Sequence, residues 1–161
     1  FISLIVGFSL VVLFMIYKFR IFGFIANLAL ISNLLLLIGI LTLFGATLTL
    51  PGIAGIILTV GMAVDANVLI YERIKEEIKN ESNKILAFDR GYIKSRSAII
   101  DANITTLIAA IILFIMGSGP IKGFSVTLGV GILTTLFSVY FIARLLTSIY
   151  VKKNKDNVNL I

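Results

Sequence analysis

Long apolar segments, each close to the length of a membrane-crossing helix, constrain the fold of this chain more than any other feature. A transmembrane helix needs roughly 20 predominantly apolar residues. Five segments approach or meet this length, at about 1–17, 22–44, 52–71, 98–116 and 124–150. The composition agrees, because 14% of the residues are charged, against about 25% in an ordinary soluble domain. The sequence therefore predicts an all-α integral membrane protein, with five transmembrane helices bundled in a single domain.

Short turns separate most of these segments. They lie at Lys18 to Arg20, Gly45 to Pro51 and Gly117 to Pro120. A longer polar stretch, 72–97, separates the third segment from the fourth, and its first part suits an amphipathic helix at the membrane surface. The chain begins at Phe1 within an apolar run, so we expect it to be a piece of a longer polypeptide.

The basic residues are distributed unequally between the two sides of the predicted bundle. One side receives the polar stretch, the first turn and the C-terminal end, with Lys18, Arg20, Arg73, Lys75, Lys79, Lys84, Arg90, Lys94, Arg96, Arg144, Lys152, Lys153 and Lys155. The opposite side receives only Lys122. Because cytoplasmic loops carry an excess of Lys and Arg, we predict a cytoplasmic loop at about 72–97 and a cytoplasmic C-terminus.

Asp65 interrupts the third apolar segment and is the most informative acidic residue. It lies roughly 10 Å along a helix from the polar stretch, too far for a short side chain to reach water. An ionised carboxylate at that depth costs several kcal/mol unless it is paired, hydrated or protonated. Low dielectric favours the neutral form, so we expect Asp65 to bind a proton more readily than a carboxylate in water does. A proton carrier needs that property.

Asp101 lies near the predicted start of the fourth segment, in a tripeptide that repeats the sequence around Asp65. Asp-Ala-Asn occurs at Asp65 to Asn67 and again at Asp101 to Asn103. The two segments are predicted to be antiparallel, which could bring both carboxylates to a similar depth. Each Asn could then donate to a carboxylate or bond across the helix interface. We therefore predict a proton- or ion-coupling site that contains Asp65, Asp101, Asn67 and Asn103.

Small residues next to Asp65 predict close helix packing at this site. Gly61 lies one turn before Asp65 on the same face, and Ala63 lies between them. Small side chains let another membrane helix approach closely.

Structural roles are the alternatives for each of these residues. Asp65 could be a polar contact that locks two helices together. Asp101 could be held by the dipole at a helix N-terminus without any role in coupling. Asn67 and Asn103 could simply connect helices.

The sequence excludes several classes of protein. It has no cysteine and no histidine, so we predict no metal site, no cofactor and no histidine-dependent acid–base chemistry. It also has no phosphate-binding loop. We predict that the chain is not an enzyme, and that its positive charge serves topology and does not bind nucleic acid.

Several motifs resemble the SecD branch of the SecD/SecF protein-export family, within the resistance-nodulation-division (RND) superfamily. They are Leu48–Gly55 (LTLPGIAG), Gly61–Ile74 (GMAVDANVLIYERI), Asp101–Thr106 (DANITT) and Gly119–Phe124 (GPIKGF), in that order. The resemblance covers essentially the whole chain. It implies a six-span protein with a large exported domain after the first span. The chain resembles spans two to six, without the first span or the exported domain.

The resemblance also implies a function. Such subunits couple proton or sodium motive force to late steps of preprotein translocation across the bacterial plasma membrane. The implied partners are SecF, the Sec translocon channel, the lipid bilayer and, through the exported domain, unfolded preprotein. The essential intramembrane carboxylate of the family maps onto Asp65. The alternatives are an RND-type exporter of small molecules or lipids, which would also carry this carboxylate, and a passive scaffold, in which Asp65 would be dispensable.

Overall fold

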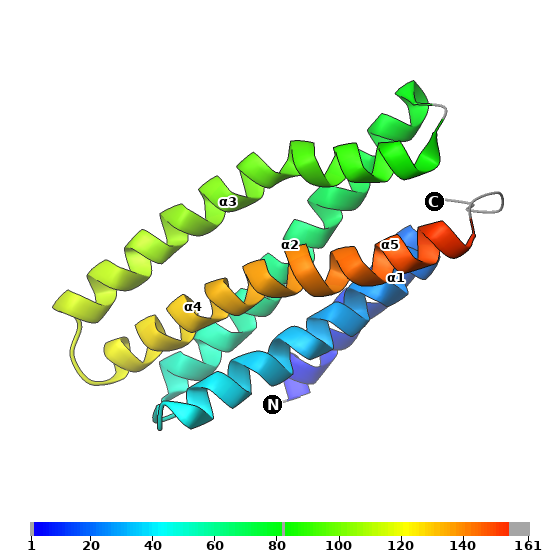
Figure 1. Cartoon of the computed structure of the whole chain (residues 1–161). Coiled ribbons are helices and arrows are strands. Elements are labelled where there is room, and N and C mark those ends of the chain that lie inside the picture. The colour runs from blue at the N-terminus through cyan, green and yellow to red at the C-terminus, as the bar shows by residue number, and fades with distance from the viewer. Residues whose placement is uncertain (1, 82, 155–161) are drawn as a thin grey trace.

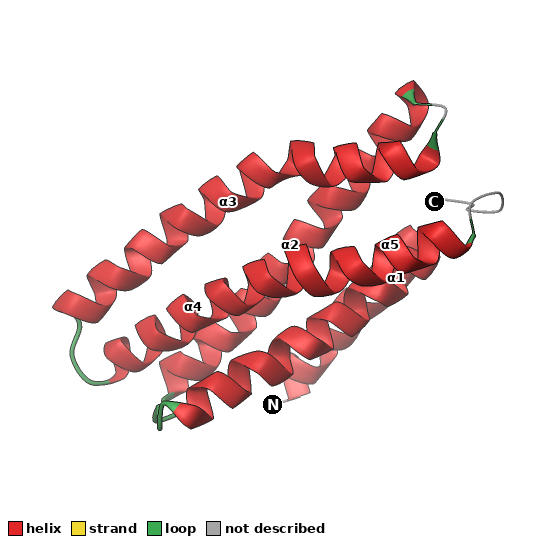
Figure 2. Ribbon diagram, in the orientation of Figure 1, coloured by secondary structure: helices red, strands yellow, loops and turns green. Residues whose placement is uncertain are grey.

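The computed structural model of this protein describes residues 2–81 and 83–154, where all regular secondary structure is helical (Figure 2). The helices are α1 (Ile2–Leu43), α2 (Leu50–Asn80), α3 (Lys84–Met116), α4 (Pro120–Phe137), the π-helix η1 (Ser138–Ala143) and α5 (Arg144–Lys153). Figure 1 shows α4, η1 and α5 as one continuous rod. Outside the described residues lie Phe1, where the first predicted span begins, Ser82 in the predicted loop, and the C-terminal residues 155–161.

Four helical rods are long and apolar enough to cross a membrane. They are Ile5–Leu43, Leu50–Asn80, Lys84–Met116 and Pro120–Lys153. The predicted all-α membrane architecture is confirmed at the level of these four long helices.

The first rod, α1, is not straight but folds back on itself at Arg20. This residue has φ 48° and ψ −116°, outside the helical region. The Asn27 side chain donates to the carbonyl oxygen of Val12 at 3.2 Å, whereas a straight helix would separate these residues by about 22 Å. Figure 1 shows the two arms, roughly 2–19 and 21–43, lying side by side. The reversal falls at the turn predicted for Lys18 to Arg20.

At the end of the bundle opposite the Arg20 reversal, one short connection joins α1 to α2 and another joins α3 to α4 (Figure 1). Before α2, the Thr49 hydroxyl accepts a hydrogen bond from the backbone N–H of Gly52 at 3.1 Å, and Pro51 occupies the first turn. Before α4, Gly119 has φ 49°, a left-handed conformation that glycine adopts without steric cost. Both connections coincide with predicted turns.

The segment predicted as a polar loop, 72–97, is almost entirely helical. Helix α2 continues to Asn80 and α3 already begins at Lys84, so only 81–83 connect them. The two helices approach closely because Gly91 presents no side chain where the buried Ile74 packs. Both helices thus continue beyond the predicted spans and pack against each other there, and the predicted surface helix is the end of α2.

An aromatic cluster holds the reversal of α1 against three other helices. The Phe22 ring lies 5.8 Å from Tyr71 of α2, 5.3 Å from Phe88 of α3 and 5.5 Å from Tyr150 of α5, between ring centroids. Phe19 adds a further contact with Tyr71 at 5.4 Å. Each such pair is worth about 0.5–1.5 kcal/mol beyond the area it buries. The cluster therefore fixes the end of the bundle at which the polar residues gather.

Gly23 provides a test of the fold-back. A Cβ at Gly23 would overlap the backbone carbonyl of Met15 in the facing arm. We expect Gly23→Ala to lower the free energy of unfolding by about 1–3 kcal/mol, measured as a lower thermal midpoint of the purified full-length protein in detergent. Gly39→Ala is the matched control, because a Cβ there meets nothing within 4 Å. Equal midpoints for the two variants would contradict the fold-back.

Candidate functional site

Asp65 lies on an outward-facing apolar stripe of α2. The stripe is formed by the exposed residues Leu58, Gly61, Asp65 and Leu69, whose spacing of three or four residues places them on one helix face. The two leucines are about half exposed, at 47% and 51%. Within residues 2–81 and 83–154, the Asp65 carboxylate makes no hydrogen bond and no ion pair. It is therefore an unpartnered carboxylate in the middle of an apolar surface.

The two asparagines of the repeated tripeptide point into the bundle. Asn67 is 3% exposed and its side chain donates to the carbonyl oxygen of Ala63 at 3.1 Å. Asn103 is 4% exposed and donates to that of Ile99 at 2.7 Å. In both residues the Oδ1 atom is buried and accepts no hydrogen bond from the described residues. Each asparagine thus satisfies its amide N–H within its own helix.

The four predicted site residues do not form one cluster in this chain. Asp65 and Asp101 are exposed, while Asn67 and Asn103 are buried. The reason is helical geometry: residues two apart lie about 200° around a helix, so the acid and the amide of Asp-Ala-Asn face opposite ways. No hydrogen bond joins either Asp to either Asn within the described ranges. Only Asp65 and Asp101 are open to a group from outside the chain.

The helix-dipole interpretation of Asp101 is wrong. It assumed that the helix begins near Ala98, but α3 begins at Lys84. Asp101 therefore lies about 25 Å from the helix N-terminus, and the dipole effect is confined to the first turn. The Thr105 hydroxyl donates to the backbone carbonyl oxygen of Asp101 at 2.9 Å. The Asp101 carboxylate itself has no partner among the described residues.

Gly61 and Ala63, predicted to allow close packing at the site, face opposite directions. Ala63 is 2% exposed and packs in the core. A Cβ at Gly61 would meet nothing within 4 Å. Gly61 borders an apolar groove of about 340 Å³ between α2 and the two arms of α1. The close approach predicted at Gly61 therefore has no partner helix within the described residues.

Sequence reasoning missed a group of ion pairs at the polar end of the bundle. Glu77 is 3% exposed, and Lys94 donates to its two carboxylate oxygens at 2.7 and 2.9 Å. The Arg73 guanidinium lies 3.7 Å from the same carboxylate. Lys94, with Arg73 in support, holds the pKa of Glu77 below its ordinary value. The only sequence signal was the abundance of opposite charges in 72–97, because Lys94 reaches Glu77 from the other helix.

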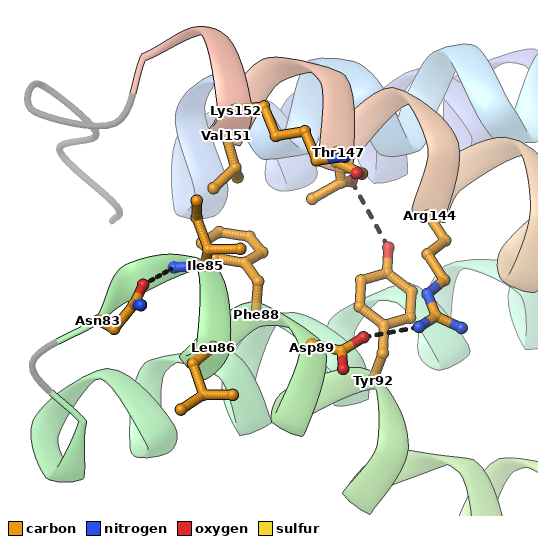
Figure 3. Close-up of a pocket in the computed structure, with 11 residues that line it drawn as sticks. Asn83, Ile85, Leu86, Phe88, Asp89, Tyr92, Arg144, Thr147, Val151 and Lys152 are labelled. Atoms are coloured by element: carbon orange, nitrogen blue, oxygen red, sulfur yellow. Dashed lines mark hydrogen bonds and ion pairs between the residues drawn. The ribbon is translucent and has the colours of Figure 1, made fainter.

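A second group connects α3 to α5 around a cavity of about 420 Å³ (Figure 3). The Arg144 guanidinium donates to Asp89 at 2.6 Å and lies 5.7 Å from the Tyr92 ring centroid. Figure 3 shows the Tyr92 hydroxyl pointing toward Thr147, with which it forms a 3.5 Å hydrogen bond. Among the described residues, no three His, Cys, Asp or Glu side chains are grouped so that they could hold a metal ion.

Comparison with known proteins gives the family. Residues 1–153 match the model described as "Protein export membrane protein SecD/SecF, C-terminal". The chain belongs to the SecD/SecF family. This match covers all of the described helices, including the stripe that carries Asp65 and the ion pairs at the polar end.

Individual members of the family are similar over most of this chain. The SecD translocase subunit of Desulfurispirillum indicum is 57% identical over 142 residues, which are 88% of this chain and 28% of that protein. That of Rickettsia prowazekii is 54% identical over 91% of this chain and 28% of its own length. The crystal structure of SecDF from Thermus thermophilus, a translocon-associated membrane protein, has a TM-score of 0.91 and 38% identity, covering 95% of this chain and 21% of its own. The chain thus spans less than a third of the length of these relatives.

The Glu77 ion pair predicts a dependence of stability on pH. Because the folded-state pKa of Glu77 is lowered, its contribution is present above the unfolded-state pKa and is lost as pH falls through the folded value. We expect Glu77→Gln to lower the thermal midpoint at pH 7, measured in detergent. On acidification to pH 4, the midpoint of Glu77→Gln should fall by less than the midpoint of the wild type. Glu76→Gln is the control, since Glu76 is an exposed carboxylate that pairs with Arg73 of the same helix, whereas Glu77 pairs with Lys94 of the other helix. An equal acid-induced loss in wild type and Glu77→Gln would contradict this role.

Proposed function

We propose that this chain is the membrane part of a SecD-type subunit that couples a proton or sodium gradient to late steps of preprotein translocation across the bacterial plasma membrane. One observation carries the proposal: on the outward apolar stripe of a membrane-length helix, Asp65 presents a carboxylate that has no partner among residues 2–81 and 83–154. Membership of the SecD/SecF family supports it. The similar proteins named above are protein translocase subunits, which favours protein export over export of small molecules or lipids.

The cost of an ionised carboxylate at this depth supports a coupling role. Asp65 lies about 10 Å along α2 from Glu72 and about 22 Å from Leu50. Facing lipid, an ionised Asp65 would cost several kcal/mol. Protonation, or a cation from another chain, removes that cost. A side chain whose charge depends on both a proton and a partner can link ion movement to movement of the partner.

A second membrane subunit, SecF in this proposal, covers the Asp65 stripe. Gly61 leaves room for a helix one turn from the carboxylate, and the adjoining groove of about 340 Å³ is lined by apolar residues. The similarity to SecDF structures supports this choice of partner. The translocon channel and the preprotein would be contacted by parts of the full-length protein beyond this chain.

We further propose five membrane spans, with the two arms of α1 crossing separately. Each arm, roughly 2–19 and 21–43, is mostly apolar, and the reversal at Arg20 lies beside Lys18. At the same end, Lys18 pairs with Glu72 at 2.8 Å and Arg144 pairs with Asp89. Among the basic residues that the structure describes, Lys122 alone lies at the other end. This asymmetry supports a cytoplasmic location for the α2–α3 connection and for the C-terminus.

Asp65→Asn in the full-length subunit, assembled with SecF, tests the coupling role. We expect preprotein export into membrane vesicles to lose the increment that a proton or sodium gradient adds, while export without a gradient is unchanged. Asn keeps the size and polarity of the side chain but cannot ionise. Glu76→Gln, which removes an exposed carboxylate near the end of α2, should keep the increment. Survival of the increment in Asp65→Asn, with normal insertion and SecF binding, would make Asp65 a structural residue.

Gly61→Leu tests the partner face separately from the ionisable group. A side chain at Gly61 meets nothing within 4 Å in this chain, so the thermal midpoint of the isolated subunit should change little. We expect co-purification with SecF to fall several-fold, because the leucine would occupy the space of the approaching helix. Gly39→Leu, on α1, should leave co-purification unchanged. Unaltered co-purification of Gly61→Leu would place the SecF contact elsewhere.

A further inference from the structure

A groove of about 500 Å³ lies on the surface between α3 and the rod formed by α4, η1 and α5. One part of it is apolar and the other carries two arginines, Arg96 and Arg144. The groove lies away from the Asp65 stripe, since it contains no residue of α2. Neither the coupling proposal nor the SecF contact uses it.

The π-helix η1 shapes the apolar part of the groove. The Phe137 and Phe141 rings stack with centroids 5.0 Å apart and are 48% and 65% exposed. Ile100 of α3 lines the opposite side. The inner face of η1 is fixed, because the Ser138 hydroxyl donates to the carbonyl oxygen of Ala29 in α1 at 2.8 Å. Single π-helical turns within α-helices occur frequently at functional sites.

The two arginines lie where the apolar wall meets the polar end of the bundle. Within the described ranges the Arg96 guanidinium has no hydrogen-bond or ion-pair partner. The Tyr140 hydroxyl is close by and donates to the Arg96 carbonyl oxygen at 3.5 Å. Arg144 is held by Asp89 and by the ring of Tyr92 (Figure 3). Two guanidinium groups thus line the groove, and one carboxylate, that of Asp89, is paired with Arg144.

Other acidic side chains nearby do not compete for these arginines. Asp101 is five residues after Arg96, which places it about 140° away around α3. Glu77 is paired with Lys94, and Glu81 with Arg90. The mouth of the groove therefore keeps an excess of positive charge.

We propose that this groove binds an anionic phospholipid, with its phosphate between Arg96 and Arg144 and an acyl chain along Phe137, Phe141 and Ile100. The apolar wall matches a hydrocarbon chain, and the arginine pair at one end matches a phosphate group. Basic pockets between membrane helices on the cytoplasmic side bind anionic headgroups. A lipid, with its charge at one end and its apolar part at the other, has the same polarity as the groove.

The probe for this site is phosphatidylglycerol with a photoreactive diazirine in one acyl chain, in nanodiscs that contain the full-length subunit. We expect its crosslinks to map to α3 and η1 around Ile100 and Phe141, and phosphatidylcholine with the same diazirine to label these positions much less. Arg96→Gln and Arg144→Gln should each lower labelling about fivefold, from about 1 kcal/mol per basic residue near an anionic headgroup. Lys79→Gln, on α2, is the matched control and should leave labelling unchanged.

Asp89→Asn separates lipid binding from a merely structural role of Arg144. It frees the Arg144 guanidinium while keeping Arg144 in place, so labelling by phosphatidylglycerol should rise. If Arg144 serves only to pair with Asp89, the thermal midpoint would fall and labelling would not rise, which contradicts the proposal. Equal labelling by the two lipids, displacement of the probe by millimolar inorganic phosphate, or crosslinks from groove residues to another protein chain would each overturn it.

Discussion

Every backbone N–H and C=O group that enters the hydrocarbon core of a membrane must find a hydrogen-bond partner within the protein. In this chain the helices meet that requirement, and the remaining architecture follows from how they pack. Because lipid tails are as apolar as leucine side chains, burial alone gives little attraction between helices. Close contact of small residues replaces it. A Cβ at Gly55 would overlap Thr127, and one at Gly131 would overlap Thr59. In both places a threonine side chain of one helix therefore packs directly against the glycine backbone of the other, α2 or α4.

The same requirement separates the polar side chains into two kinds. The buried asparagines are hydrogen-bonded: Asn67 and Asn103 donate to carbonyl oxygens one turn back in their own helices, and Asn33 of α1 donates to Thr135 of α4 at 3.1 Å. They connect or stabilise helices without any charge. Asp65 and Asp101 face outward, and within the described chain neither has a partner. Ionisable groups left in this state point to interactions with another chain or with protons.

The two ends of the bundle differ in construction. At one end, short turns join apolar helices. At the other, the aromatic cluster around Phe22 and the ion pairs of Glu77 and Asp89 join α1, α2, α3 and α5. The Asp65 stripe lies between these ends, and it is the face that we propose the partner subunit covers. The groove beside η1 lies on the polar half, where lipid headgroups would meet the arginines.

The sequence alone determined the apolar parts of the helices, the turn at Arg20, the family resemblance and the place of Asp65 within an apolar helix. Each of these depends on local pattern: hydropathy gives the length of a span, and glycines or charges mark its ends. Tertiary structure decided which face of each helix turns inward. Asp65 and Asn67 lie on opposite faces, and a single sequence does not say which of the two meets another helix. Tertiary structure also placed Ile74 against Gly91 where α3 runs back to Lys84, and Lys94 beside Glu77. Such contacts join residues far apart in the chain, so they depend on how whole helices fit together and leave no local pattern.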